Sequence, residues 1–306
     1  MTNASIPGVS IFIPTWNDAT DLAACLDSLK LLDYPRGRVE IVIWDNNSQD
    51  DTTEVVEAKF KEMQTQGWLE LRLIHSPRNE GSYIPYNLAE DALSPETEFI
   101  LGLDADVEVA PDVLTHLVAA AQGDSAGVIG ARSVYFDKPD QTAHGAGFVN
   151  RLTAKYGEAD PAEPTDCDYV IGCCWLLNRR VFLEVGGFNP DFFINHWEVE
   201  YCLRVKTQGY RVRYEPRAVA RHRLPVGGMR RSDRLYYNYR NKLLMIRKSP
   251  YFPRRRLAAT ACVLMSSARI VLDAIGMRRV GEAAISFRGL YDGIWGRTGP
   301  LVSDRP

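Results

Sequence analysis

Short apolar runs recur along the first 131 residues, and segments with a helical pattern separate them. Apolar runs bounded by polar residues are typical of strands that are buried on both faces of a parallel sheet. The runs are Val9–Pro14, Val39–Trp44, Leu69–Ile74, Phe99–Leu103 and Ala126–Ala131. Strands that alternate with helices in this way predict an α/β fold with a parallel, doubly wound sheet.

The first four predicted strands each lead into a polar residue, namely Asn17, Asp45, Asn79 and Asp104. Ligands of open α/β sheets bind at the carboxyl ends of the strands, so these side chains together predict a nucleotide site. Asp45 and its neighbours could hold a base and ribose through hydrogen bonds. Asp45 and Asn79 also suit ordinary turns, which Asn and Asp favour.

Two carboxylates, Asp104 and Asp106, follow the fourth strand with one residue between them. Alternation along an extended chain would aim both side chains the same way, and two like charges in a dry pocket repel each other strongly. A hard cation such as Mg²⁺ or Mn²⁺ would relieve that repulsion and could bridge to a diphosphate. The simpler alternative is a solvated acidic turn before a helix at Pro111. His222 could complete an Asp/His metal site, although a lone histidine is usually structural.

Several classes of protein are disfavoured. No Gly-x-Gly-x-x-Gly follows the first strand and no P-loop occurs, which argues against dinucleotide dehydrogenases and P-loop nucleotidases. The six cysteines lack Cys-x-x-Cys spacing, so we expect a reducing compartment and no structural zinc. The N-terminus lacks the pattern of a secretory signal, which favours a cytoplasmic location.

The second half of the sequence has less regular patterning. Ser133–Asp168 is rich in glycine, proline and charge, and we interpret it as a variable insertion on the acceptor side. Further predicted elements are an apolar run at Asp168–Leu177, helices at Arg179–Val185 and Trp197–Gln208, and short strands at Arg211–Tyr214 and Ala218–Ala220. Glu198 lies in the first turn of the second helix, where the helix N-terminus stabilises a carboxylate whether or not it has another role.

The C-terminal region is basic. Residues 204–256 contain 17 Lys and Arg against two acidic residues, while the whole chain has a net charge of −3. Such a segment is suited to binding phosphate or an anionic membrane surface. The acidic remainder of the chain argues against nucleic acid as a partner. Arginines 221, 223, 230 and 231 could instead serve a diphosphate.

We expect a helix at Ser232–Lys248 and a second, largely apolar one at Leu257–Ile275. Arg269 and Asp273 interrupt the second, so a transmembrane span is not expected. It would either pack on the catalytic domain or lie on a membrane surface, with residues 204–275 meeting anionic lipid at the inner face of the plasma membrane.

Taken together, these motifs resemble the inverting nucleotide-sugar glycosyltransferases of family two, in particular those acting on bacterial cell-surface glycans, such as rhamnosyltransferases. The segments that carry the resemblance are Pro14-Thr15-Trp16-Asn17, Asp33-Tyr34-Pro35, Glu40–Thr52, Asn79-x-Gly81 with Asn87, Asp104-Ala105-Asp106, Tyr169–Leu177, Gly186-Gly187-Phe188, Phe192-Phe193 and Tyr236–Asn241. The order of the elements matches over roughly residues 9–248.

The resemblance implies a GT-A fold, that is, a Rossmann-like, mostly parallel sheet flanked by helices, here with a C-terminal helical extension. It implies a catalytic domain at 1–230, with a nucleotide half at about 1–131 and an acceptor half at about 132–230, and an extension at 231–306. The reaction would be a single, inverting displacement that moves a sugar from a UDP- or dTDP-sugar to a hydroxyl of a glycan or lipid-linked glycan.

The resemblance also implies roles for individual residues. Asp106, His222 and Asp104 would hold Mg²⁺ or Mn²⁺, and Glu198 would be the general base. The donor would contact Pro14, Thr15, Asn17, Asp45, Asn47, Asn79, Gly81 and Asp104.

The sequence departs from the family pattern at Trp197-Glu198-Val199-Glu200, where Glu-Asp-Val-Asp is usual. A glutamate can accept the same proton as an aspartate, but its extra methylene displaces the carboxylate. A non-catalytic glycan- or nucleotide-sugar-binding module with a decayed base site is therefore the alternative. A third possibility is a nucleotidyltransferase that makes the sugar nucleotide. This class is disfavoured, because it would need a glycine-rich, basic N-terminal loop, which Gly8–Asn17 lacks.

Overall fold

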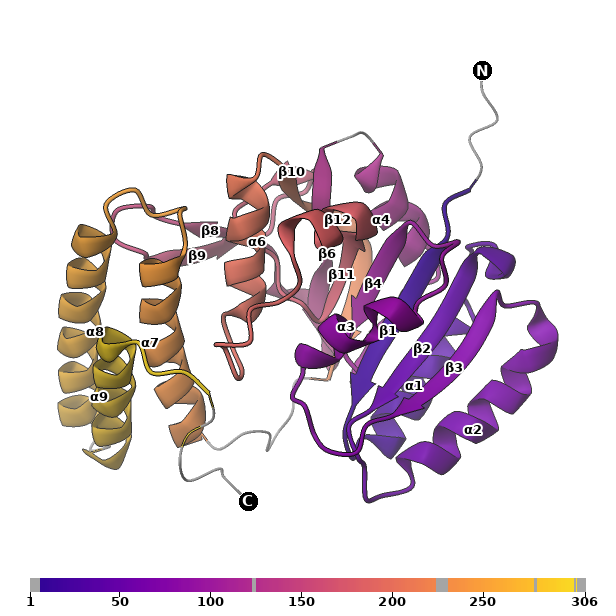
Figure 1. Cartoon of the computed structure of the whole chain (residues 1–306), viewed down its shortest axis with the longest axis horizontal. Helices are drawn as coiled ribbons and strands as arrows, with labels where there is room; N and C mark the ends of the chain where they lie inside the picture. The colour runs from indigo at the N-terminus through magenta and orange to yellow at the C-terminus, as the bar shows by residue number, and fades with distance from the viewer. Residues whose placement is uncertain (1–5, 123–124, 224–230, 278–279, 300, 302–306) are drawn as a thin grey trace.

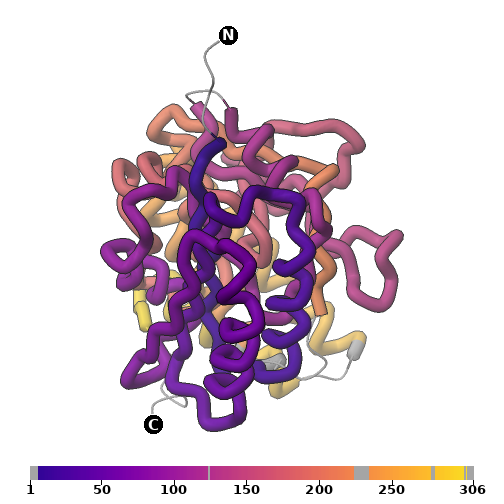
Figure 2. Tube along the Cα trace, turned by 90° about the vertical axis from the view of Figure 1, so that its right-hand side faces the viewer, coloured from indigo at the N-terminus to yellow at the C-terminus, as the bar shows by residue number. Residues whose placement is uncertain are grey.

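The computed structural model describes residues 6–122, 125–223, 231–277, 280–299 and 301. It consists of an α/β body and a layer of three C-terminal helices on one side of that body (Figure 1). The view in Figure 2 is turned by 90°, and it shows the first strands and helices in front and the C-terminal helices behind them.

The four N-terminal strands form a parallel sheet, as the sequence predicts. They are β1 (Val9–Thr15), β2 (Val39–Asp45), β3 (Glu70–His75) and β4 (Phe99–Leu103), in the spatial order β4-β1-β2-β3. Thr15 pairs with Asp45, and Asp45 pairs with His75. Because these three strands end in register, the loops that follow them lie at one edge of the sheet.

The sheet continues beyond β4 with β11 (Cys174–Asn178), β6 (Ala126–Tyr135), β12 (Arg211–His222) and β10 (Thr165–Asp166). β11 runs antiparallel to both of its neighbours, so the sheet is mostly parallel, as expected. The long path from β6 to β11 is made of strands and loops without a crossover helix. An antiparallel strand does not require such a helix.

The segment that the sequence left without a clear pattern, residues 133–168, is folded mostly as strands. β7 (Lys138–His144) pairs with the long end of β6, and β8 (Ala146–Val149) pairs with β9 (Tyr156–Ala159) in a separate two-stranded sheet. The two short strands predicted at Arg211–Tyr214 and Ala218–Ala220 are parts of one strand, β12. Its pairing with β6 is interrupted by a shift in register after Glu215. A short strand, β5 (Val107–Val109), pairs with the end of β12.

Helices cover both faces of the sheet. They are α1 (Ala19–Leu29), α2 (Thr52–Met63), α3 (Ile84–Ala89), α4 (Val113–Ala121), α5 (Arg179–Val185) and α6 (Trp197–Thr207), with short 3-10 turns at Arg36–Arg38, Gln64–Gln66 and Glu90–Ala92. Alternate residues of β1 point to opposite faces. Ile11 and Ile13 pack with α1 and α4, whereas Phe12 packs with the core that contains α3 and α6.

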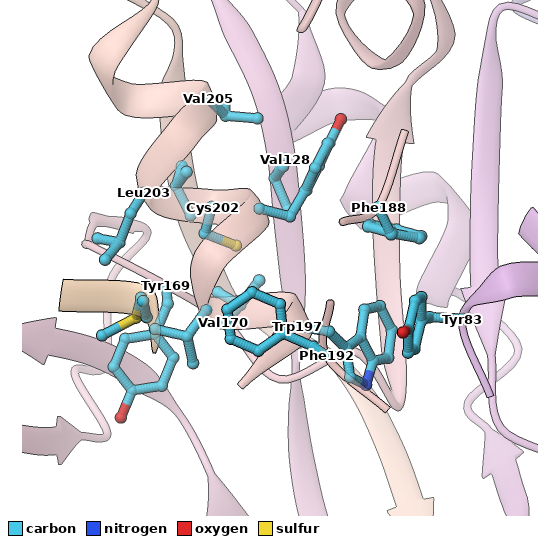
Figure 3. Close-up of a cluster of buried hydrophobic side chains, with 14 of the residues drawn as sticks. Tyr83, Val128, Tyr169, Val170, Phe188, Phe192, Trp197, Cys202, Leu203 and Val205 are labelled. Atoms are coloured by element: carbon cyan, nitrogen blue, oxygen red, sulfur yellow. The ribbon is translucent and has the colours of Figure 1, made fainter. Parts of the chain in front are cut away.

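The core on the α3 and α6 side is rich in aromatic rings. Trp197, at the start of α6, lies between Tyr83 and the loop that carries Phe188 and Phe192 (Figure 3). Its ring centroid is 5.6 Å from that of Tyr83 and 4.8 Å from that of Phe188. Offset and edge-on aromatic pairs add to the free energy of burial, so this cluster fixes the position at which α6 begins.

The C-terminal extension contains α7 (Arg231–Lys248), α8 (Arg255–Met277) and α9 (Val280–Trp295). The first two lie where the sequence predicts helices, whereas α9 is not among the predicted elements. A Cβ atom at Gly289 or Gly293 of α9 would lie within 3 Å of the α7 carbonyl oxygens of Tyr236 and Arg240. The two glycines therefore allow α9 to approach α7 closely.

Among the described residues, one helical stretch, Arg255–Gly276, is long and apolar enough to cross a membrane by length and composition alone. One face of α8 is packed, since Ala258, Cys262 and Ile270 are buried. Its other face is exposed, with Leu264 at 66%, Leu272 at 69% and Ile275 at 74% of their full accessible area.

Candidate active site

Three of the predicted metal ligands lie together at the end of β4. Each of Asp104, Asp106 and His222 offers one ligand atom, and these atoms lie within 4.8 Å of one another. His222 is the last residue of β12 and pairs with Val107 of β5, which brings its ring beside the two aspartates. The Nε2 atom of His222 is 3.2 Å from Oδ1 of Asp106.

Backbone hydrogen bonds hold this group of residues in place. The amide of Asp104 donates to the carbonyl oxygen of Cys173 at 3.0 Å. The amide of Arg223 donates to the carbonyl oxygen of Asp106 at 3.0 Å. The two aspartates are thus tied to the loop before β11 and to the end of β12.

The electrostatics of this cluster favour a cation. Burial, together with the charges of Asp106 and Glu198 and against the opposing charge of His222, raises the pKa of Asp104 to about 7. Burial disfavours the charged form of His222, but its hydrogen bond to Asp106 raises the pKa of the imidazole to about 11. Mn²⁺ and Mg²⁺ both take carboxylate oxygens, and the imidazole can be a further ligand once it has lost its proton, so the residues fit a divalent ion that replaces the proton of His222.

The loops after β1 and β2 are hydrogen-bonded to each other. The Oδ1 atom of Asn17 accepts from the amide of Gln49 at 2.7 Å, and the amide of Asn17 donates to the hydroxyl of Ser48 at 2.9 Å. Asn17 and Asn47 both have left-handed backbone conformations, with φ of 55° and 65°. Asparagine tolerates this region better than most residues, which explains its use in both turns.

Asp45 is buried at the centre of these loops, and its carboxylate has partners on both sides. Its Oδ1 accepts from the amide of Ser48 at 3.0 Å, and its Oδ2 lies 3.3 Å from Nδ1 of His75. Thr15 is also buried, and Pro14 partly so. The predicted donor residues of the first two loops are therefore brought together at one edge of the sheet.

Asn79 and Gly81 form the turn of the third loop. The Oδ1 atom of Asn79 accepts from the amide of Gly81 at 2.8 Å, and Gly81 has φ of 86°, which glycine adopts without strain. Asn87, part of the same sequence motif, points elsewhere. Its amide group exchanges two hydrogen bonds with the backbone of Phe188, so it connects α3 to the acceptor side.

Sequence reasoning missed two residues of this edge, Asn46 and His75. The buried Asn46 accepts from the amide of Glu80 at 3.1 Å and donates to the carbonyl of Gly81 at 3.2 Å, so it connects the second loop to the third. His75 ends β3 beside Asp45. The register of the predicted parallel strands could have found His75, whereas nothing in the sequence distinguishes Asn46 from its neighbour Asn47.

Glu198 occupies the first turn of α6. Burial raises the pKa of its carboxyl group to about 7, with a backbone hydrogen bond and His144 lowering it and Glu158 raising it. Its Oε2 atom is buried and has no hydrogen-bond partner among the described residues. The negative charge of Glu198 contributes to the raised pKa of Asp104.

The neighbouring positions of α6 differ from Glu198. Trp197 is part of the aromatic core, and the carboxylate of Glu200 is bound by Arg204 through two hydrogen bonds of 3.1 and 3.2 Å. Arg204 also donates to three backbone carbonyls of residues 185–187. Of the two glutamates, Glu198 is the one with a carboxylate oxygen that has no hydrogen-bond partner among the described residues.

A cavity of about 560 Å³ adjoins His222, and Lys138 and Arg223 line it. The guanidinium of Arg223 lies over the ring of Phe136 at 3.6 Å from its centroid and donates to Glu108. The side chain of Arg221 is exposed. Arg230 and the side chain of Arg231, also considered for diphosphate binding, lie outside the described residues.

Residues 10–186 match the family described as Glycosyl transferase family 2. The chain belongs to this family. It is therefore a glycosyltransferase, and its sheet and helices are those of the GT-A fold expected from the sequence.

Individual relatives agree with this assignment. The chain is 28% identical over 222 residues to the O-antigen biosynthesis protein RfbC of Myxococcus xanthus, covering 67% of this chain. It is 24% identical over 210 residues to the low-salt glycan biosynthesis hexosyltransferase Agl10 of Haloferax volcanii, covering 66% of this chain and 68% of Agl10. The chain spans 16% of RfbC and 24% of protein y4gI of Sinorhizobium fredii.

Among solved structures, the fold resembles that of the mannosyltransferase PcManGT from Pyrobaculum calidifontis, determined with GDP-Man and Mn²⁺. The TM-score is 0.64 at 18% identity, with 95% of this chain and 88% of the other covered. At this identity the likeness shows the fold alone.

Proposed function

We propose that this glycosyltransferase moves a sugar, with inversion, from a UDP- or dTDP-sugar to a hydroxyl of a glycan or lipid-linked glycan. The observation that carries the proposal is the cluster of two carboxylates and an imidazole at the ends of β4 and β12, and it is supported by a glutamate in the first turn of α6 whose buried carboxylate oxygen has no partner among the described residues. A single displacement needs a stabilised leaving group on one side of the anomeric carbon and a base on the other.

On the donor side, Asp45 contacts the base or ribose, and the turns with Pro14, Thr15, Asn17, Asn47, Asn79 and Gly81 shape the nucleotide pocket. Asp106, His222 and Asp104 would hold Mg²⁺ or Mn²⁺, which would supply positive charge to the diphosphate. The loops are hydrogen-bonded to one another before any donor arrives, which reduces the entropy lost on binding.

On the acceptor side, Glu198 takes the proton of the attacking hydroxyl. A base is most effective when its pKa lies near the working pH, and burial places the pKa of Glu198 at about 7. The free carboxylate oxygen of Glu198 supports catalysis over the alternative of a binding module with a decayed base site.

The test is calorimetric titration with UDP-, dTDP- and GDP-sugars, with and without Mn²⁺. We expect metal-dependent binding of one donor, lost in Asp106→Ala and kept in Asp91→Ala, a matched change at an exposed aspartate away from the site. Binding without turnover would favour the binding module. If none of the nucleotide sugars binds, with or without the metal ion, the proposal fails.

We also propose that the extension touches an anionic membrane surface from the cytoplasmic side. The exposed leucines and isoleucine of α8 lie on the same element as Arg255 and Arg256, and Trp295 of α9 is 66% exposed. Apolar side chains flanked by arginines are typical of helices that lie in a membrane interface. The basic segment 204–275 would supply the attraction to anionic lipid.

Sedimentation with vesicles tests this second proposal. We expect binding to phosphatidylglycerol vesicles, weak binding to phosphatidylcholine vesicles, and a loss of binding in the double variant Leu264→Glu/Leu272→Glu. Leu31→Glu is the matched control, because Leu31 is 67% exposed on the α/β body. Equal binding by the double variant and the wild type would overturn the proposal.

A further inference from the structure

The loop that precedes α6 has an unusual backbone. Asn195 and His196 are both left-handed, with φ of 62° and 67°. No side chain caps the helix, and the carbonyl of His196 accepts the first helical hydrogen bond, from Glu200, at 2.9 Å. The direction of the first turn of α6, and with it the direction of Glu198, depends on what holds this loop.

Asn241 of α7 holds the loop from the C-terminal extension. Its Nδ2 atom donates to the carbonyl oxygens of Ile194 at 2.6 Å and Asn195 at 2.9 Å, and Asn241 is fully buried. Carbonyl oxygens only accept hydrogen bonds, so the amide nitrogen of Asn241 must be the atom that faces the loop.

Arg240 fixes the other end of the same amide. Its Nε donates to Oδ1 of Asn241 at 2.9 Å, and its guanidinium lies over the rings of Tyr236 and Tyr237, at 5.4 and 4.8 Å from their centroids. Arg240 is 1% exposed. Both ends of the Asn241 amide are thus hydrogen-bonded, which leaves the amide one orientation.

We propose that Asn241 is a positioning residue for glycosyl transfer, which holds the 194–196 loop and thereby aims the carboxylate of Glu198. The inference rests on the proposed role of Glu198 as the base. Proton transfer tolerates displacements of only a fraction of an ångström, so a base on an uncapped first turn requires such support.

The test compares Asn241→Leu, which keeps the branched shape of the side chain but removes the hydrogen bonds, with Asn238→Leu, a matched change at a half-buried asparagine of the same helix. With water as the acceptor, the assay follows nucleoside diphosphate released from the donor identified by titration, with saturating Mn²⁺. We expect at least a tenfold lower kcat for Asn241→Leu, a donor KM within twofold of wild type, and no change for Asn238→Leu.

Two further readouts separate positioning from a general loss of structure. A loosened loop admits water to Glu198, so the acidic limb of the pH profile of kcat moves to lower pH. Hydrogen exchange of residues 197–200 becomes faster, while exchange in β1 and β2 is unchanged. Asn241→Gln, which keeps the amide, recovers part of the rate, and the same criteria apply to it if Asn241→Leu does not fold.

The outcomes distinguish this inference from the proposed function. If Glu198→Gln keeps the wild-type rate, the proposed base is wrong. If Glu198→Gln is impaired but Asn241→Leu is not, only the positioning role fails. A lower kcat with an unmoved pH limb, or with an equal loss of donor affinity, also overturns the positioning role.

Discussion

The loops after β1, β2 and β3 hydrogen-bond to one another through Asn17, Asp45 and Asn46, whereas Glu198 of α6 has a buried oxygen with no partner among the described residues. The proposed donor side is therefore preorganised by its own side chains. On the proposed acceptor side, the oxygen of Glu198 has no partner among the described residues, and α7 holds the loop that precedes α6. This difference predicts that the two sides respond differently to mutation.

The largest effect is expected on the donor side, from Asp106→Asn. The change removes one of the ligands of the metal cluster, so the leaving diphosphate loses its stabilising charge. We expect kcat/KM to fall by about 10³-fold. Steady-state kinetics at increasing Mn²⁺ checks this, with Asp91→Asn as the control. A rate that Mn²⁺ restores fully would mean that Asp106 is not essential to the metal site.

Glu198→Gln should affect only the acceptor side. The substitution keeps the shape of the side chain but removes the proton acceptor, so kcat should fall by about 10²-fold or more. Donor affinity, measured by titration, should stay within twofold of wild type. Glu184→Gln, at an exposed glutamate of α5, serves as the control. A parallel loss of donor affinity would show that the two sides are not separable.

The dependence on pH should report the acceptor side when Mn²⁺ is saturating. Burial raises the pKa of Glu198 to about 7, and a base works only when it is deprotonated. The rate should therefore rise about tenfold per pH unit below pH 7 and level off above it. A profile of kcat from pH 5 to 9 measures this. The residual activity of Glu198→Gln should lack this rise in rate below pH 7.

The smallest effect is expected from Asn46→Ala, which tests the preorganisation of the donor loops. The change leaves the amide of Glu80 and the carbonyl of Gly81 without their present partner. We expect the free energy of unfolding to fall by about 1–3 kcal/mol, measured by denaturant titration. Donor affinity should weaken by about tenfold while the pH limb of kcat stays in place. An unchanged donor affinity would indicate that the loops are held by other contacts.

The sequence was sufficient for the parts of the fold that depend on local patterns. Phe99–Leu103 and Arg179–Val185 are an apolar run and a helix in the sequence, and they form β4 and α5 with the same bounds. β11 and the strands of residues 133–168 were harder to predict, because their pairing depends on partners distant in the chain. The direction of β11 in particular is a property of the whole sheet.

The residues of the proposed site follow the same division. Asp104, Asp106 and the proposed donor loops could be picked out as candidates because motifs at strand ends keep their spacing in the sequence. Asn46 was missed because its contacts lie with the next loop, and Asn241 because it acts on a segment about 45 residues earlier. His222 was found as a candidate, but only the pairing of β5 with β12 explains why it lies beside Asp106.

The position of β11 has a consequence for how such enzymes can be divided or recombined. This strand comes from the predicted acceptor half, yet it lies beside β4, the strand that carries Asp104 at its end. A fragment that stopped at residue 131 would leave the apolar edge of β4 open to pairing with another molecule, so it would aggregate instead of binding donor. Exchange of acceptor specificity between relatives should therefore replace loops between strands and keep residues 174–178 with their native partner.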